Sequence, residues 1–374
     1  MKVRGAVLRQ MGLPAPYAES RPLEVADVEL DPPGEGELLV RVGAAGLCHS
    51  DLSVIDGSRP RVMPMLLGHE AAGEVVEAGP GTHGFSEGDH VVLAFVPTCG
   101  ECGPCRAGRP ALCEPGARAN TAGTLLSGEH RLHGADGELL NHHLGVSCFA
   151  DHMVVSERSA VRVDPGLPFD VAALFGCAVL TGVGAAVNSA QVAVGDRVAV
   201  FGLGGVGLAA LLGARVAGAA ELIAVDVVPE KLSLAAELGA THTVLAGEDA
   251  VEEIRELTGG GAEKAIETVG SERVLAEAYA ATRRGGTTVS VGLPHPDRML
   301  SIPAVSLVAE ERTLRGSYLG SCVPERDLPR FIEMYREGRL PVDRLLTHRI
   351  SLDEVNEGFD RLARGEAVRQ AIVF

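Results

Sequence analysis

Short apolar segments separated by turn residues dominate the first part of the chain, residues 1–165. The strand-like runs include MKVRGAVLR at the N-terminus, ELLVRVGAAG before Cys48 and FADHMVVSE at 149–157. Because many short strands bounded by glycine and proline turns are typical of small barrels, this region is predicted to be mostly β. The exception is residues 114–148, which are predicted to be irregular.

From residue 194 the pattern changes to apolar strands that alternate with helices. The strand DRVAVF is followed by the helix LAALLGARVAGA and the strand LIAVD, and the alternation continues to a helix at 271–286 and a strand at 287–294. Strands that alternate with helices predict a doubly wound parallel sheet. The fold class of the chain is therefore α/β.

The C-terminal part, after about residue 321, resembles the first region more than the second. It contains one helix, CVPERDLPRFIEMYREG, and a mixed tail that ends in the strand-like QAIVF. We therefore expect a nucleotide-binding domain at 179–321 to be inserted into a first domain made of 1–178 and 322–374.

One apolar stretch, residues 171–195, contains no Asp, Glu, Lys or Arg and is long enough to span a membrane. Its Asn188, Ser189 and Gln191 are unfavourable in hydrocarbon, so a buried helix followed by a loop is the better interpretation. The N-terminal residues lack the apolar core of a signal peptide. We expect a cytoplasmic protein without a membrane partner.

The net charge and the length of the chain limit the classes of function that fit this sequence. The net charge of −17 argues against a nucleic-acid partner, because binding to a phosphate backbone requires clustered Lys and Arg. A chain of 374 residues is long enough for two or three domains. A globular enzyme that acts on a small molecule fits both observations.

Four of the eight cysteines lie within fifteen residues, in the spacing C-x2-C-x2-C-x7-C. Four thiolates complete a tetrahedral zinc shell and leave no open position, so the group predicts a structural zinc site. An iron–sulfur cluster usually has its fourth cysteine three residues on, followed by proline, which does not fit the gap of seven. The predicted ligands are Cys99, Cys102, Cys105 and Cys113.

Cys48 and His69 form a second candidate metal site, since thiolate and imidazole together suit zinc. Each residue alone is also common in protein cores. A third ligand is needed, and spacing does not select it from Cys148, Cys177 and Cys322. The adjacent pair His142-His143, in the irregular stretch, is interpreted as surface or pocket lining rather than as a metal site.

A dinucleotide-binding fingerprint follows the strand DRVAVF: Gly202, Gly204, Gly205, Val206 and Gly207 open the next helix. Such glycines let the backbone approach a pyrophosphate, which binds at the helix N-terminus. Asp226 ends the second strand and would accept hydrogen bonds from the adenosine ribose, whereas its charge would repel a 2′-phosphate. The sequence therefore predicts NAD rather than NADP, with Lys231 as a further candidate contact.

These pieces together resemble the zinc-containing medium-chain alcohol dehydrogenases. The matching motifs, in order along the whole chain, are GLCHSD at 46–51, GHE at 68–70, the four-cysteine group, GCAVLTG at 176–182, GLGGVG at 202–207 and the closing VRQAIVF. The resemblance implies a GroES-like β-rich catalytic domain, a Rossmann domain and one catalytic zinc beside the structural one. It also implies that Cys177 joins Cys48 and His69 as the third ligand.

The resemblance assigns further roles by position. Asp51 is expected to orient His69, Glu70 to lie behind the metal, and Ser50 to take the proton of the alcohol. Cofactor contacts are expected from His49, Thr181, Val291 and Arg369, and substrate-pocket positions are Arg59, Phe95, His143 and Leu144. The long segment 114–148 resembles that of the dimeric branch, so a homodimer is expected, with a tetramer as the alternative.

The leading hypothesis is an NAD-dependent dehydrogenase of primary alcohols, of the aromatic or medium-chain kind, and their aldehydes. Ser53 stands where well-known members continue the proton relay with histidine. Arg59 and Ala117 stand where the glutathione-dependent formaldehyde branch has an acid and an arginine, which disfavours a glutathione adduct. A formaldehyde dehydrogenase that uses another small thiol and a non-catalytic NAD-binding relative are the alternatives.

Overall fold

The computed structural model describes all residues from 1 to 374 and separates into two compact units. The first unit consists of residues 1–177, 323–329 and 346–374, and the second consists of residues 178–322 and 330–345. The predicted first domain included residues 330–345, which the structure places in the second unit, where Arg344 Nη2 lies 2.5 Å from Glu237 Oε2.

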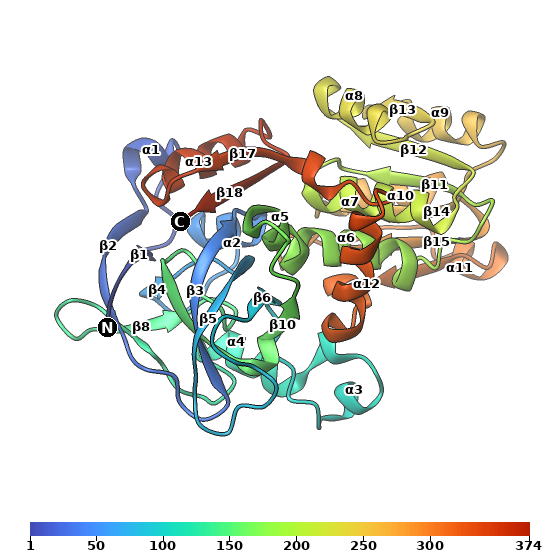
Figure 1. Cartoon of the computed structure of the whole chain (residues 1–374). Coiled ribbons are helices and arrows are strands. Elements are labelled where there is room, and N and C mark those ends of the chain that lie inside the picture. The colour runs from blue at the N-terminus through green and yellow to red at the C-terminus, as the bar shows by residue number, and fades with distance from the viewer. The chain divides into compact units, whose positions relative to one another are not determined.

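A barrel and a sheet form the first unit (Figure 1). The closed barrel has the strand order β1 (Lys2–Leu8), β2 (Leu23–Leu30), β7 (Leu132–His133), β8 (Leu139–His142) and β4 (Met65–Leu66). The seven-stranded sheet has the order β10 (Ala160–Val163), β6 (His90–Leu93), β5 (Ala71–Ala78), β3 (Glu37–Gly46), β18 (Arg369–Val373) and β17 (Leu346–Ile350), and β9 (His152–Ser156) also pairs with β3.

Strand β3 lies at the centre of this sheet because alternate apolar side chains bury one of its faces. Leu38, Val40 and Val42 are at most 1% exposed, as expected for a strand with period-two patterning. The C-terminal strand β18 pairs antiparallel with the end of β3, with Ala371 opposite Gly46. The C-terminal strand therefore joins a sheet whose other strands, except β17, come from residues 37–163.

Short helices connect these strands: α1 (Tyr17–Ser20), α2 (His49–Ile55), α3 (Gly103–Arg106), η1 (Pro110–Leu112), α4 (Glu114–Ala122), η2 (Glu157–Ser159), α5 (Phe169–Leu174), η7 (Leu352–Glu354) and α13 (Val355–Ala363). Helix α12 (Pro324–Arg336) has residues in both units.

The prediction that residues 114–148 are irregular is wrong. They contain α4, β7 and β8, and the Sγ of Cys113 caps α4 by accepting the N–H of Gly116. Small and polar residues in α4 leave no clear apolar stripe, so its periodicity is invisible in the sequence. The segment is fixed by Glu37, which is 1% exposed and accepts hydrogen bonds from Ser127 Oγ and Arg131 Nε, both at 2.8 Å.

The second unit is built on a six-stranded parallel sheet. Its strand order is β13 (His242–Leu245), β12 (Glu221–Asp226), β11 (Arg197–Phe201), β14 (Ala262–Glu267), β15 (Thr282–Ser290) and β16 (Thr313–Gly316). Numbered within the sheet this is 3-2-1-4-5-6, the Rossmann order. The predicted doubly wound sheet is confirmed.

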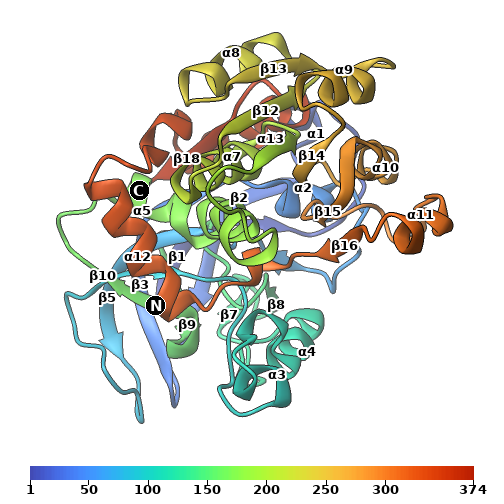
Figure 2. The same cartoon turned by 90° about the vertical axis from the view of Figure 1, so that its right-hand side faces the viewer.

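Helices α7 (Gly205–Ala217), α8 (Pro229–Glu237), α9 (Ala250–Leu257) and α10 (Glu272–Ala281) pack on that sheet, and α11 (Ala304–Ala309), η5 (Leu319–Ser321) and η6 (Val342–Leu345) complete the unit. Figure 2 shows α8 and α9 next to β13, and α11 near β16. Since β13 and β16 are the two edge strands, these helices mark the opposite ends of the sheet.

The predicted helix over 271–286 is too long, because α10 ends at Ala281 and β15 begins at Thr282. The hydroxyl of Thr282 donates to the carbonyl of Ala278, and its backbone pairs with Ala262 of β14. Thr282 thus closes the helix and starts the strand.

The apolar stretch Phe169–Ser189 is the one helical segment long and apolar enough to cross a membrane, and 89% of its most apolar window is buried within the protein. It consists of α5, the π-helical segment η3 (Phe175–Val179), α6 (Leu180–Gly184) and the π-helical η4 (Ala185–Ser189). Such burial is that of a core helix, as predicted.

The ion pair of Glu263 with Arg197 provides a test of the second unit. Burial opposes ionisation, but hydrogen bonds from Arg197 lower the pKa of Glu263 to about 2. Its oxygens lie 2.6 Å from Arg197 Nη2 and 3.1 Å from Arg283 Nε. Because the folded pKa is below the unfolded value of about 4.3, the stabilisation is present above pH 4.3 and is lost as the pH falls towards 2.

We expect Glu263→Gln to lower the free energy of unfolding by about 1–2 kcal/mol at pH 7, discounted for solvent screening. The difference from the unmodified protein should shrink below about pH 4.3. Denaturant titrations at pH 7, 5 and 4 measure it, with the exposed Glu248→Gln as the control. Equal effects of the two substitutions at pH 7 would contradict this role of the ion pair.

Candidate functional site

Three predicted metal ligands meet in the first unit. The Sγ atoms of Cys48 and Cys177 and a ring nitrogen of His69 all lie within 4.8 Å of one another. The three residues are 7%, 5% and 0% exposed. Cys148 and Cys322, which spacing alone left open as third ligands, do not belong to this group.

Different elements bring these ligands together. Cys48 follows β3 and precedes α2, His69 lies between β4 and β5, and Cys177 lies in the π-helical segment η3. Such π-helical turns often occur at functional sites, because the extra residue displaces a side chain from the regular helix. Gly46 is required nearby, since a Cβ at this position would lie 2.3 Å from Glu70 Oε1.

His69 is held so that one of its nitrogens is available for a ligand. Its Nδ1 is 3.1 Å from Asp51 Oδ1, and its ring packs edge-on against Phe95 with centroids 5.4 Å apart. Its Nε2 is buried and has no hydrogen-bonding partner. An orphaned imidazole nitrogen beside two thiols fits a zinc ion, which Nε2 and the two sulfurs would hold with a fourth position open.

The groups around Cys48 favour its thiolate form, which is the form that binds a metal. A hydrogen bond from Cys177, opposed by burial and supported by His69, lowers the pKa of the Cys48 thiol. Burial also opposes ionisation of Asp51, but the neighbouring His69 and His143 keep its pKa below the usual range. Asp51 is therefore a buried carboxylate in contact with His69, which fits the predicted role of orienting a metal-bound histidine.

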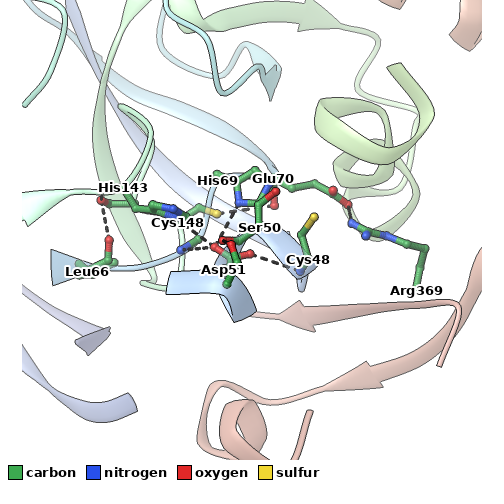
Figure 3. A network of polar contacts seen from close by, with 12 residues as sticks. Cys48, Ser50, Asp51, Leu66, His69, Glu70, His143, Cys148 and Arg369 are labelled. Atoms are coloured by element: carbon green, nitrogen blue, oxygen red, sulfur yellow. Dashed lines mark hydrogen bonds and ion pairs between the residues drawn. The ribbon is translucent and has the colours of Figure 1, made fainter. Parts of the chain in front are cut away.

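Glu70 forms a buried ion pair with Arg369 (Figure 3). Glu70 is 0% and Arg369 is 4% exposed, and they are 299 residues apart in sequence. Burial, opposed by Arg369, raises the pKa of Glu70 to about 6. The pairing of β18 with β3 places Arg369 at the site, so one Nη of the predicted cofactor contact is already used by Glu70.

The four-cysteine group forms a separate cluster, with all four sulfurs within 4.8 Å of one another. Backbone N–H groups point at these sulfurs: Cys99 donates to Cys113 Sγ at 3.2 Å, and Cys102 donates to Cys99 Sγ at 3.3 Å. Such contacts stabilise thiolates, so the donor set fits a zinc ion with no open position.

The other predicted residues of the first unit lie in or after α2 and after the end of β8. His49 is exposed and Ser50 is half-buried at the start of α2, while the hydroxyl of Ser53 donates to the carbonyl of Ser50 at 2.9 Å. Arg59 is half-buried in the loop after α2, and Leu144 is 7% exposed.

Of the two interpretations given for His142 and His143, the surface position is wrong, whereas pocket lining stays a prediction. Both are 1% exposed, and burial together with the charges of His130 and Arg131 lowers the pKa of His142 to about 3. His143 Nδ1 lies 3.1 Å from Asp51 Oδ1. This contact was missed because nothing in the spacing of two residues 92 positions apart indicates it.

The second unit contains the predicted fingerprint at the end of β11. A Cβ at Gly207 would lie 1.8 Å from the carbonyl oxygen of Gly202, so only glycine fits there, whereas Gly204 faces open space. Asp226, at the end of β12, accepts the N–H of Leu203 at 2.6 Å and that of Val228 at 2.9 Å. The glycine turn and the acid are thus coupled, as in a dinucleotide site.

The remaining predicted cofactor residues lie in the same unit. The hydroxyl of Thr181, on α6, is buried without a partner, and Val291 follows β15. Gly205 and Val206 form the first turn of α7, and the half-buried Lys231 lies in the first turn of α8. The open cradle at Gly204 and the free hydroxyl of Thr181 fit a bound nucleotide.

Comparison with known proteins agrees with this geometry. Residues 34–165 match the family model described as the alcohol dehydrogenase GroES-like domain, and residues 205–337 match that described as zinc-binding dehydrogenase. The NDMA-dependent alcohol dehydrogenase of Amycolatopsis methanolica is 39% identical over 381 residues, with 100% of this chain and 99% of the relative covered. The chain belongs to the zinc-containing medium-chain alcohol dehydrogenases.

Two further relatives of this alcohol dehydrogenase have informative names. The S-(hydroxymethyl)glutathione dehydrogenase of Paracoccus denitrificans is 35% identical over 384 residues, covering 100% of both chains. The crystal structure of the benzyl alcohol dehydrogenase of Acinetobacter calcoaceticus matches with a TM-score of 0.93 and 32% identity, covering 100% of this chain and 99% of the other.

Several predictions for this zinc-dependent alcohol dehydrogenase are thereby confirmed: the family, the GroES-like and Rossmann fold class, and the class of oxidoreductase. The predicted cofactors also fit, since two clusters of ligands suit zinc and the Rossmann unit suits NAD. The individual roles of the site residues stay predictions.

Metal analysis tests the two zinc clusters. We expect two zinc ions per chain, and Cys48→Ala should retain one, because the four-cysteine cluster is separate. The matched control is Cys148→Ala, a buried thiol outside both clusters, which should retain two. Two zinc ions in a fully active Cys48→Ala protein would disprove the proposed ligand set.

Proposed function

We propose that this alcohol dehydrogenase oxidises primary alcohols of the aromatic or medium-chain kind to aldehydes with NAD, and catalyses the reverse reduction. The observation that carries the proposal is the cluster of Cys48, Cys177 and the unpartnered Nε2 of His69. A zinc ion held there would act as a Lewis acid that makes the hydroxyl of an alcohol more acidic. NAD would accept the hydride.

The residues of the chain have simpler tasks. Asp51 orients His69, and the Glu70–Arg369 pair balances charge beside the thiols. Ser50 is the proposed acceptor of the alcohol proton. The Ser53 hydroxyl donates its hydrogen to the backbone carbonyl of Ser50, so this hydrogen is not available to continue a proton relay. Ser50 is half-buried and would therefore pass the proton of the alcohol directly to water.

The preference for an apolar substrate is supported by the side chains near His69. Phe95 packs against the His69 ring, and Leu144 follows His143, which also contacts that ring edge-on at 5.5 Å. The name of the Acinetobacter relative, a benzyl alcohol dehydrogenase, is consistent with an aromatic substrate. Arg59 is proposed as a pocket residue that would select among such alcohols.

The preference for NAD over NADP rests on Asp226. Its carboxylate is 8% exposed and is fixed by two backbone N–H groups, so it cannot easily turn away from a 2′-phosphate. A negative charge held in this position opposes a phosphate and accepts from ribose hydroxyls.

A substrate panel tests these proposals. With NAD, benzyl and medium-chain primary alcohols should have higher kcat/KM than ethanol, and replacement by NADP should lower kcat/KM by about tenfold or more, a cost of about 1.4 kcal/mol. No thiol should be needed.

Formaldehyde with glutathione or another small thiol belongs in the same panel, because the Paracoccus relative is named for a glutathione adduct. A strict requirement for a thiol would replace the first proposal by the thiol-adduct alternative. If added NAD alone supports no turnover and NDMA does, the chain shares the dependence in the name of the Amycolatopsis relative.

We further propose a cytoplasmic homodimer joined through the β16 edge of the second unit. The edge strand β16 pairs only with β15, which leaves its outer backbone groups available for another strand. Large apolar side chains in the segment that precedes β16 are exposed, including Met299 at 83%, Val305 at 72% and Val308 at 83%. An open strand edge beside exposed apolar residues favours a symmetric contact between two copies.

The dimer is tested by light scattering coupled to size-exclusion chromatography. The unmodified chain should elute with twice the mass of one chain, and Val308→Asp should shift it to a monomer, because an aspartate would be buried in the interface. Val194→Asp, at another site of 87% exposure, should not alter the mass. A monomeric unmodified chain or a dimeric Val308→Asp variant would contradict this interface.

A further inference from the structure

The carboxylate of Asp51 is close to four nitrogen atoms, and only one of them belongs to His69. Its Oδ1 lies 3.1 Å from His69 Nδ1, 3.1 Å from His143 Nδ1 and 3.2 Å from the backbone N of Gly68. Its Oδ2 lies 3.3 Å from the backbone N of Cys48. Asp51 itself is 0% exposed, so these four groups replace water.

We propose that His143 is a positioning residue for the catalytic zinc site: its ring, with Nδ1 3.1 Å from Asp51 Oδ1, confines that carboxylate, and Asp51 in turn fixes the ring of His69. The inference rests on the zinc site proposed at Cys48, His69 and Cys177. Figure 3 shows Asp51 between His143 on one side and Cys48 on the other.

The chemistry of the contact assigns the proton. An ionised carboxylate can only accept, so the hydrogen must be on Nδ1 of His143, whatever the state of its other nitrogen. The Nδ1 atom is buried and lies 3.1 Å from Asp51 Oδ1, but the contact does not have the direction of a full hydrogen bond.

The ring of His143 is itself fixed by its backbone. The N–H of His143 donates to Ser147 Oγ at 2.8 Å, and the Ser147 hydroxyl donates to the carbonyl of Leu66 at 2.8 Å. The N–H of Val146 donates to the carbonyl of His143 at 3.0 Å, which closes a turn. The turn at 143–147 is therefore attached to β4, three residues before His69, and holds the imidazole in place.

His143 contacts Asp51 from a different chain segment than the backbone N–H groups of Cys48 and Gly68. The backbone N–H groups of Cys48 and Gly68 belong to the same segments as the metal ligands and move with them. His143 comes from a different segment, and its ring stands at 88° to the ring of His69 with centroids 5.5 Å apart. It therefore fixes the carboxylate from a direction that the ligand segments do not supply.

Loss of this donor should weaken zinc at the catalytic site. Substitution of partners of metal-bound histidines typically lowers metal affinity by about 10–100-fold, and His143 acts one contact further away, so we expect about tenfold. His143→Phe removes the N–H and keeps an aromatic ring. His143→Asn restores an N–H, because its amide nitrogen is attached at Cγ as Nδ1 is.

The experiment measures the zinc dissociation constant of the catalytic site by competition with a chromogenic chelator, and the d–d spectrum after replacement of that zinc by Co²⁺. The structural cluster of Cys99, Cys102, Cys105 and Cys113 is the internal control. His142→Phe is the matched variant, because this neighbour is equally buried but its Nε2 accepts the N–H of Arg131 instead.

We expect His143→Phe to weaken the catalytic zinc about tenfold and to shift the Co²⁺ spectrum, while His143→Asn stays close to the unmodified protein. His142→Phe should leave both properties unchanged. The positioning role would be overturned if His143→Phe bound zinc as tightly as the unmodified protein and had the same Co²⁺ spectrum. It would also be overturned if His143→Asn lost as much zinc affinity as His143→Phe. Only one zinc in the unmodified protein would instead overturn the site on which the inference rests.

Discussion

The catalytic unit depends on the compensation of buried charge. Asp51, His69 and Glu70 are 0% exposed, and the thiols of Cys48 and Cys177 lie beside them. Moving a charge out of water costs several kcal/mol unless it is paired. Arg369 compensates Glu70, and hydrogen-bond donors together with His69 compensate Asp51. A divalent metal ion held by Cys48, His69 and Cys177 would compensate the charge of the two thiolates.

The topology of the first unit brings these charged groups together. Arg369 and Glu70 are 299 residues apart in sequence, and they meet because the C-terminal strand β18 pairs with β3. Cys177 reaches Cys48 from the helix that follows β10, and a π-helical turn displaces its side chain from the regular α-helical positions. In physical terms, the sheet order places the ligands and the irregular helix turn adjusts one of them.

The sequence alone predicts those features that depend on neighbouring residues. The cysteine spacing at 99–113 and the glycines at 202–207 are local patterns, and each cluster forms where it was expected. Alternating strands and helices likewise predicted the parallel sheet, although β15 starts earlier because Thr282 is both the helix cap and a strand residue.

The features that escaped prediction depend on tertiary contacts. Helix α4 has no apolar stripe and is capped by a sulfur of the metal cluster, which periodicity cannot detect. Spacing could not choose Cys177 over Cys148 and Cys322, and only the resemblance to a family did so. The contact between His143 and Asp51 joins segments 92 residues apart, so it becomes visible only in three dimensions.

The two zinc clusters differ in the sequence separation of their ligands, and this difference affects how metal binding is coupled to folding. The four-cysteine ligands lie within fifteen residues, and three of them are partly exposed, so the chain can surround a metal at a small cost in loop closure. The catalytic ligands span 130 residues and are all buried. Their geometry exists only once β3, β5 and the helix at 169–189 have packed together. Metal binding at the first cluster is therefore coupled to local order, whereas binding at the second is coupled to the fold of the whole unit.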